Sequence, residues 1–178
     1  SLLSIFERKK ITERDSPGPG VKSILLIGCH RTGQSIALHL PKKDLLIVDF
    51  DPEVIRDLER RGFSHVFGDI ADPDITSRVS LDDVKVAIST SPSVEDNLLV
   101  LSLFADKSGK ARPRIILRAE DDEAARILYR RGADYVLFPN FTAGQYLGKT
   151  IAIDPEMRIL AQLRETDQSL MRKVASKF

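Results

Sequence analysis

The residues with the clearest chemical potential lie in one loop, within the stretch SILLIGCHRTGQSIALHL. Gly28 follows an apolar run typical of a buried strand, and Gly33 falls in what the pattern indicates is the next helix. Glycine permits the sharp turn between such elements, and free N–H groups at a helix N-terminus attract anions. Arg31 adds a guanidinium whose fork geometry suits phosphate oxygens. The loop therefore predicts a phosphate site, although a tight turn with a solvent-facing arginine would show the same pattern.

The middle position of this loop departs from the dinucleotide fingerprint G-x-G-x-x-G. His30 stands where the fingerprint has the glycine that lets a pyrophosphate approach the backbone closely. This histidine weakens the case for a pyrophosphate pressed against the loop but leaves the helix dipole and the free amides in place. The neighbouring Cys29 is either a thiol activated by the helix N-terminus and Arg31 or a small buried spacer, and the high burial of cysteines favours the spacer.

An acidic residue follows at the position where a ribose-binding carboxylate is expected. Asp49 ends the apolar part of LLIVDFDPE, about 20 residues beyond the loop. A carboxylate there accepts hydrogen bonds from the 2′- and 3′-hydroxyls of a ribose and repels a 2′-phosphate, which disfavours the phosphorylated nicotinamide cofactor. The alternative role for Asp49 is to cap the next turn. Strand, loop, helix, strand and acid occur in the right order, which favours a nucleotide site.

Strand-like runs alternate with helix-like segments between residues 21 and 140. The runs are SILLI, DLLIV, SHVF, VKVAIS, PRIILR and DYVLF. Short apolar strands separated by helices predict an α/β fold with a doubly wound, Rossmann-like, six-stranded parallel sheet covered on both faces. An internal echo agrees with two similar halves, because DPEVIRDLERRGFSHVF from Asp51 aligns with DDEAARILYRRGADYVL from Asp121. Each segment is predicted to be a helix that ends at a left-handed glycine and leads into a strand.

Two end segments flank this region. Residues 1–20 end in PGPG and read as a linker, either a disordered terminus or a tether. Residues 141–178 form a predicted helical tail, with a capping box that begins at Thr142 and a last helix that begins with Asp154 as N-cap and Pro155 as N1. The apolar stripe of this tail either docks on its own domain or meets a partner.

Composition excludes several classes of protein. The net charge of +1 gives no global attraction to nucleic acid, and the single cysteine excludes an intrachain disulfide and suits a cytosolic chain. No apolar run approaches the roughly 20 residues needed to span a bilayer. Three scattered histidines and one cysteine show no metal-site spacing.

Four stretches taken together resemble a known family. LLIGCHRTG, IVDFDPE, FGDIADPD and IILRAEDDEAARILYRRGADYVLFP are similar, in order and spacing, to an RCK domain, the regulator of potassium conductance, also called the TrkA-N or KTN domain. The resemblance covers about residues 21–140. The GCHR variant and the arm LLSIFERKK further resemble the cytosolic part of a Kef-type monovalent cation:proton antiporter, in which a membrane transporter precedes the domain in the same chain.

The resemblance implies residue roles. The loop would face the ligand's phosphates and Asp49 would hold the ribose. The remaining implied positions are Asp69 and Ile70 beside the adenine, Ser89 and Thr90 along the crevice, and Arg118 near a phosphate, while Gly28, His30, Arg31 and Gly33 form the loop. Each has a simpler alternative as a turn or cap residue, and Arg118 could instead pair with Glu120 or Asp121.

The resemblance also implies a function. The family binds NAD, AMP, ADP or ATP, and His30 favours AMP here, with NAD and ATP left open. The expected protein is a non-enzymatic regulatory domain at the cytoplasmic face of a membrane, dimeric through its C-terminal helices, with no nucleic-acid partner. Two alternatives remain: a ligand-free dimerisation scaffold, and an NAD-dependent oxidoreductase. The second lacks a Tyr-x-x-x-Lys pair and room for a substrate domain.

Overall fold

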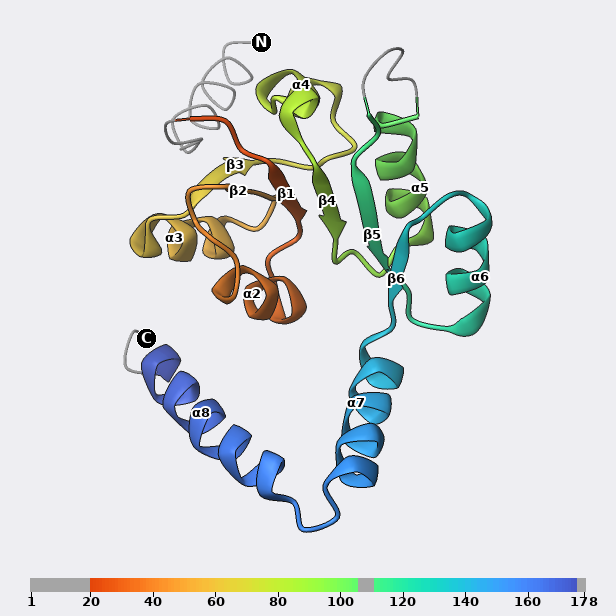
Figure 1. Ribbon diagram of the computed structural model, residues 1–178. Coiled ribbons are helices and arrows are strands. Elements are labelled where there is room, and N and C mark those ends of the chain that lie inside the picture. The colour runs from red at the N-terminus through yellow and green to blue at the C-terminus, as the bar shows by residue number, and fades with distance from the viewer. Residues whose placement is uncertain (1–19, 106–110, 176–178) are drawn as a thin grey trace. The chain divides into compact units, whose positions relative to one another are not determined.

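The computed structural model describes residues 20–105 and 111–175, and the predicted arm therefore lies, apart from Gly20, outside the described residues. The chain divides into two compact units, residues 1–137 and 138–178, and each is considered by itself. The elements of the first unit are β1 (Ile24–Ile27), α2 (Arg31–Leu38), β2 (Leu45–Asp49), α3 (Pro52–Arg61), β3 (Ser64–Phe67), α4 (Pro73–Arg78), the short 3₁₀ helix η1 (Leu81–Asp83), β4 (Val86–Ser89), α5 (Val94–Leu103), β5 (Arg114–Arg118), α6 (Asp122–Arg130) and β6 (Tyr135–Leu137) (Figure 1).

The strands form one sheet in the order β3-β2-β1-β4-β5-β6, and every neighbouring pair is parallel. This confirms the predicted doubly wound, Rossmann-like sheet. The order reverses direction between β1 and β4, so the two halves of the sheet are related about that boundary. The sequence echo falls on equivalent pieces of the two halves, α3–β3 and α6–β6.

The helices of the echo are followed by glycines with positive φ, as predicted, and each helix begins at a capping aspartate. Asp51 accepts a hydrogen bond from the Glu53 amide at the start of α3, and Asp121 accepts one from the Ala124 amide in α6. Gly62 ends α3 in the left-handed conformation with φ 67°. The second half has the same features, because an aspartate caps α6 and Gly132, which also has a positive φ, precedes β6.

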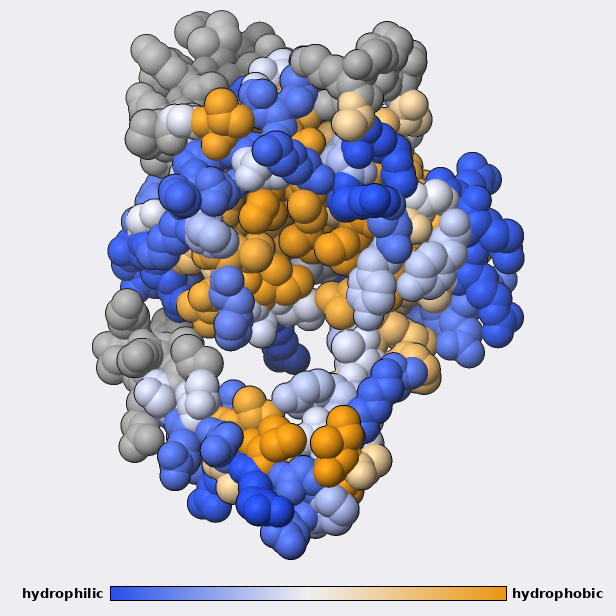
Figure 2. All heavy atoms as spheres, in the orientation of Figure 1, coloured by the Kyte–Doolittle hydropathy of each residue, from blue (hydrophilic) through white to orange (hydrophobic). Residues whose placement is uncertain are grey.

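Both faces of the sheet are apolar, which explains why the strands read as continuous apolar runs. On one face Leu25 and Ile27 pack with residues of α4, α5 and α6. On the other face Leu26 packs with residues of α2 and α3. Figure 2 shows apolar side chains gathered over the middle strands of the visible face.

The second of these faces is only half covered by helices of its own unit. Ile88, Ile116 and Tyr135 lie in one row across β4, β5 and β6. Ile88 is buried and Ile116 is partly buried, whereas Tyr135 is 47% exposed. Within the described part of this unit, helical cover on this face therefore decreases from β4 toward β6.

The second unit consists of α7 (Pro139–Ile153) and α8 (Arg158–Ala175), which confirms the C-terminal helical extension. The predicted capping box at Thr142 is wrong, because Pro139 occupies the first turn and Thr142 lies inside α7. The predicted start of the last helix is also wrong. Asp154 is the C-cap of α7, and Met157, with φ 58°, turns the chain before α8 begins. The Asp154 carboxylate instead accepts from the Ile159 amide in α8.

Many apolar side chains of α7 and of the turn after it are exposed. Those most relevant are Phe141, Tyr146, Leu147, Ile151 and Ile153. No helix within the described ranges combines the length and apolarity needed to cross a bilayer.

Candidate functional site

A cleft of about 380 Å3 lies at the carboxyl ends of the strands, where the strand order reverses. Parallel α/β sheets bind ligands at this position because the strand ends and helix N-termini converge there. Seven of the ten predicted site residues line the cleft: Gly28, His30, Asp49, Asp69, Ile70, Thr90 and Arg118. Arg31, Gly33 and Ser89 are not among the lining residues, so the structure brings most of the predicted set together but not all of it.

The two loop glycines each meet a steric requirement. Gly28 has φ 81°, which glycine adopts without strain, and a Cβ on it would lie 2.8 Å from the Thr90 hydroxyl. A Cβ on Gly33 would lie 2.2 Å from the Gly28 carbonyl oxygen. Gly33 therefore lets α2 approach the end of β1 closely, and the Thr90 hydroxyl fixes that strand end by donating to the same carbonyl at 3.0 Å.

The N-terminus of α2 differs from the other helix starts around the sheet. Side chains of Asp51, Asp72, Ser93 and Asp121 cap α3, α4, α5 and α6. At α2 the N-cap is His30, which makes no side-chain cap bond, and the first turn holds no acid. The first-turn amides of α2 therefore keep their positive partial charge and can donate hydrogen bonds to an anionic ligand.

His30 is engaged elsewhere. Its Nε2 lies 3.3 Å from the Asp51 carboxylate, and its side chain is 71% exposed. Because the other oxygen of Asp51 caps α3, the pair connects the loop after β1 with the turn after β2. The imidazole therefore lines the cleft beside the N-terminus of α2.

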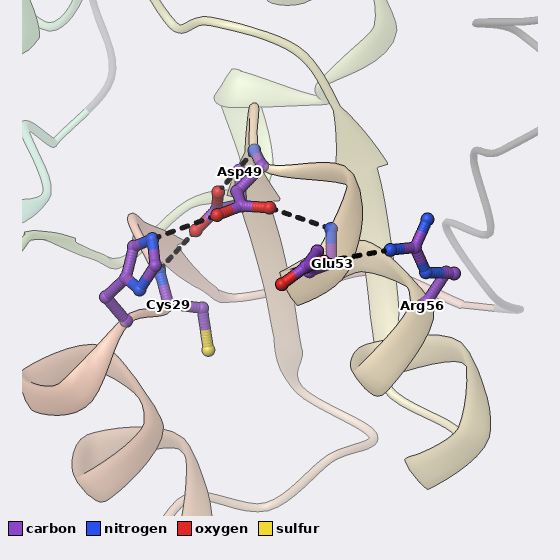
Figure 3. Close-up of polar contacts among 6 residues, drawn as sticks. Cys29, Asp49, Glu53 and Arg56 are labelled. Atoms are coloured by element: carbon purple, nitrogen blue, oxygen red, sulfur yellow. Dashed lines mark hydrogen bonds and ion pairs between the residues drawn. The ribbon is translucent and has the colours of Figure 1, made fainter.

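Asp49 is buried and holds two loops at once. Its carboxylate accepts from the Cys29 amide at 2.6 Å and from the Asp51 amide at 2.8 Å (Figure 3). The turn-capping role considered as an alternative is thus present. A carboxylate offers about four acceptor positions, so two amide bonds leave capacity for the hydroxyls of a ribose.

Cys29 points away from this carboxylate in Figure 3 and is almost fully buried. Burial raises the pKa of its thiol to about 12, and the nearby charges of Asp49 and Asp57 add to that effect while Arg61 opposes it. A thiol with so high a pKa is not a nucleophile at neutral pH. The structure therefore favours the spacer interpretation.

Arg118 reaches the cleft from the end of β5. Its guanidinium bonds the Glu120 carboxylate at 2.5 Å and donates to the Thr90 carbonyl at 3.3 Å. Its Nε is buried and has no hydrogen-bond partner. The predicted alternative, pairing with Glu120, is therefore what the structure contains, and a phosphate would have to compete with that carboxylate.

Sequence reasoning missed part of the lining. Phe50 is 69% exposed beside Asp49, and residues 91–93 and Asp96 form the wall that follows β4. Asn97 supports this wall from full burial by donating to the carbonyls of Ser91 and Arg118. Their position in the sequence could have identified these lining residues, because the first residues after any strand of a parallel sheet reach this edge.

The charges that line the cleft are mostly negative. Asp49, Asp69 and Asp96 contribute carboxylates, against the guanidinium of Arg118. Among the described residues no group of three His, Cys, Asp or Glu side chains is arranged to hold a metal ion. The site therefore has a localised anion-binding corner at α2 within otherwise acidic surroundings.

Comparison with protein families matches residues 24–139 to the TrkA-N domain. Among solved structures, the TrkA-N domain of the inner membrane protein ybaL from Escherichia coli is similar, with 22% identity and a TM-score of 0.62 over 72% of this chain and 95% of that one. The Kef CTD of Shewanella denitrificans in its AMP-bound form has 18% identity and a TM-score of 0.60, over 89% of this chain and 100% of that one.

A third similar structure is the NAD(P)-binding domain of an exopolyphosphatase-related protein from Archaeoglobus fulgidus. It has 25% identity and a TM-score of 0.60, over 74% of this chain and 98% of that one. The comparison with curated proteins finds no significant match.

Proposed function

The chain belongs to the TrkA-N domain family, and on that basis we propose that it is a cytosolic regulatory domain that binds an adenine nucleotide and gates a monovalent cation/proton transporter. The observation that carries the proposal is the uncapped N-terminus of α2 beside the buried Asp49 carboxylate, in a cleft at the strand-order reversal. This arrangement offers two anchors for a nucleotide. The helix N-terminus can bind the phosphate, and the carboxylate can accept hydrogen bonds from the ribose hydroxyls.

The proposed pose follows from these two anchors. The phosphate lies on the loop formed by Gly28, His30 and Gly33, with Arg31 close to it in sequence, and Asp49 accepts from the ribose hydroxyls. The adenine then lies near Asp69 and Ile70, where the exposed ring of Phe50 offers apolar surface. Thr90 and Arg118 bound the opposite side of the cleft, and Ser89 lies buried behind them at the end of β4.

AMP is the proposed ligand for two physical reasons. The cleft volume of about 380 Å3 is near the lower end of the roughly 300–1,000 Å3 typical of small-molecule sites, which suits a mononucleotide better than NAD. The three lining carboxylates also repel the additional phosphates of ATP. The AMP bound to the Shewanella Kef CTD supports the same choice.

We propose further that the domain works as a homodimer through its C-terminal helices, with a membrane transporter N-terminal in the full-length chain. Support comes from the exposed apolar residues of α7 and from the thinly covered row that ends at Tyr135. A nucleotide could bias the transporter only through different affinities for its two states, so the dimer arrangement would have to change the cleft.

The test is thermal unfolding of the chain with AMP, ADP, ATP, NAD and NADH, repeated on Asp49→Asn and Arg31→Gln, with Arg126→Gln as a matched control. A ligand at a hundredfold excess over its Kd stabilises the native state by about 2.7 kcal/mol. We expect the largest shift with AMP, lost in Asp49→Asn, reduced in Arg31→Gln and kept in Arg126→Gln. No shift with any nucleotide would favour the ligand-free scaffold, and consumption of NADH would favour the oxidoreductase.

A further inference from the structure

The two edges of the parallel sheet carry opposite charge. Segments that follow strands share the edge with the cleft, and segments that precede strands share the other edge. Residues 28–31, 49–53, 68–74, 90–96 and 118–123 end or follow strands and contain twelve acidic residues against two arginines. Residues 20–23, 41–44, 60–63, 79–85, 111–114 and 130–134 precede strands and contain ten lysines and arginines against four acidic residues. The net charge of +1 for the whole chain conceals this separation.

Helix dipoles account for only part of the basic edge. Arg60, Arg61 and Arg130 lie in the last turns of α3 and α6 and Arg131 is the C-cap of α6, and cations are favoured at these helix ends. The remaining cations lie just before a strand or, for Arg114, at its first residue, and no helix dipole favours them there. These are Lys22, Lys42, Lys43, Lys85, Arg112 and Arg114, which together with the helix-end arginines are called the basic edge below.

These cations form a row across the sheet. Ile24, Leu45, Val86 and Arg114 pair side by side in β1, β2, β4 and β5, so the basic residues that come just before them are neighbours. The Lys22 ammonium donates to the Lys43 carbonyl at 2.9 Å, which shows how close the first two segments lie. Two carboxylates partly neutralise the row: Asp134 pairs with both Arg112 and Arg114, and Asp57 pairs with both Arg60 and Arg61. Each carboxylate cancels only one of its two positive charges.

The chain enters the sheet at this same edge. β1 begins at Ile24, and Figure 1 shows the chain reaching it at the end opposite to α2. If a membrane transporter precedes the domain, as proposed above, its tether joins the sheet at the basic edge. We propose that the basic edge docks on the anionic headgroups of that membrane, which leaves the acidic edge and its cleft facing away from the lipid. This inference rests on the proposed function for the direction of the tether.

Screening lets the two edges act separately. At physiological ionic strength the Debye length is about 8 Å. A strand of four residues, such as β1, separates the edges by about 13 Å before the loops are added. The anionic surface therefore attracts the basic edge without an equal repulsion from the acidic one, and each lysine or arginine near it strengthens binding about fivefold.

The experiment is co-sedimentation of the 178-residue chain at physiological salt with vesicles of phosphatidylcholine alone or of phosphatidylcholine mixed with phosphatidylglycerol. The test variant replaces Lys43, Lys85, Arg130 and Arg131 by glutamine. These side chains make no polar contact in the described structure, so the fold should persist, as circular dichroism can verify. The control variant replaces Arg56, Arg126, Lys149 and Arg164 by glutamine and changes the net charge equally.

We expect binding to the anionic vesicles only, weakened at least tenfold in the test variant and changed little in the control variant. Equal loss in both variants would mean that net charge alone drives binding and would overturn the inference. Absence of binding, or equal binding to neutral vesicles, would overturn it as well, and the surface would then be tested against acidic proteins or nucleic acid. None of these outcomes bears on nucleotide binding, which the thermal-unfolding test decides by itself.

Discussion

Substitution of Gly33 by alanine tests the close approach of α2 to β1. In an exposed helix interior this change stabilises a protein, because alanine has the better helix propensity by about 0.8–1.0 kcal/mol. At Gly33 the added Cβ would lie 2.2 Å from the Gly28 carbonyl oxygen and 3.0 Å from its carbon. The clashing group is the backbone carbonyl of Gly28, which cannot move aside easily because the Thr90 hydroxyl donates a hydrogen bond to it. The helix must therefore retreat by about 1 Å to restore ordinary contact.

The magnitude follows from the competition of these two effects. Overpacking of a well-filled contact costs about 1–3 kcal/mol, and a clash with fixed backbone belongs at the upper end. After the gain in propensity, we expect Gly33→Ala to lower the free energy of unfolding by about 1–2 kcal/mol. For a chain of this length that corresponds to a melting temperature lower by about 2–8 °C. The retreat of α2 also moves its first-turn amides, so AMP affinity should fall.

Gly148→Ala is the matched control, because a Cβ at Gly148 in the middle of α7 would meet nothing within 4 Å. There only the propensity gain remains, and stability should rise by up to about 1 kcal/mol. The chain has no tryptophan, so urea unfolding is followed by far-UV circular dichroism. If both substitutions raised stability alike, the steric argument at Gly33, and with it the described seat of α2 on β1, would be refuted.

Two further predictions concern titrating groups. Because the pKa of Cys29 is raised to about 12, iodoacetamide at pH 8 should leave it unmodified until the protein unfolds, and labelling at the rate of a free thiol would contradict this. Burial disfavours the charged form of Asp134, but hydrogen bonds from the Ile115 amide and Arg114, with the charges of Arg112 and Arg114, outweigh it and lower its pKa. Asp134→Asn should therefore reduce stability at pH 7 by about 1–3 kcal/mol. A carboxylate whose pKa is lower in the folded state stabilises the protein fully above its unfolded pKa of about 3.9. The difference in unfolding free energy between the wild type and Asp134→Asn should therefore shrink as the pH falls below that value. If urea unfolding gave the same difference at every pH, the lowered pKa of Asp134 would be refuted.

The sheet could be predicted almost completely from the sequence. SHVF is β3 residue for residue, and the other five runs differ from their strands by one or two residues at the ends. Strands buried on both faces must be apolar throughout, so their signal is strong. The helix starts in the second unit were harder, because Pro139 and Met157 set them through backbone geometry rather than through a capping side chain.

The candidate site could be predicted less completely. Gly28, Asp49 and Arg118 were found because their positions relative to strand ends carry a motif. Phe50, Asn97 and the wall at residues 91–93 belong to no motif, and their place at the cleft depends on β4 lying beside β1. His30 was singled out as an obstacle to a dinucleotide, whereas its pairing with Asp51 required the three-dimensional neighbourhood of two loops.

The difference between α2 and α5 gives the cleft a direction. Both helices begin at the strand-order reversal, at equivalent places in the two halves of the sheet. The N-terminus of α5 is occupied, because Ser93 caps it and Glu95 and Asp96 lie in its first turn, whereas that of α2 is bare. A ligand with one anionic end and one neutral end can therefore enter in a single orientation. The two halves of the sheet are similar in fold but differ in the charge at their first helix. The cleft therefore distinguishes the anionic end of a ligand from its neutral end.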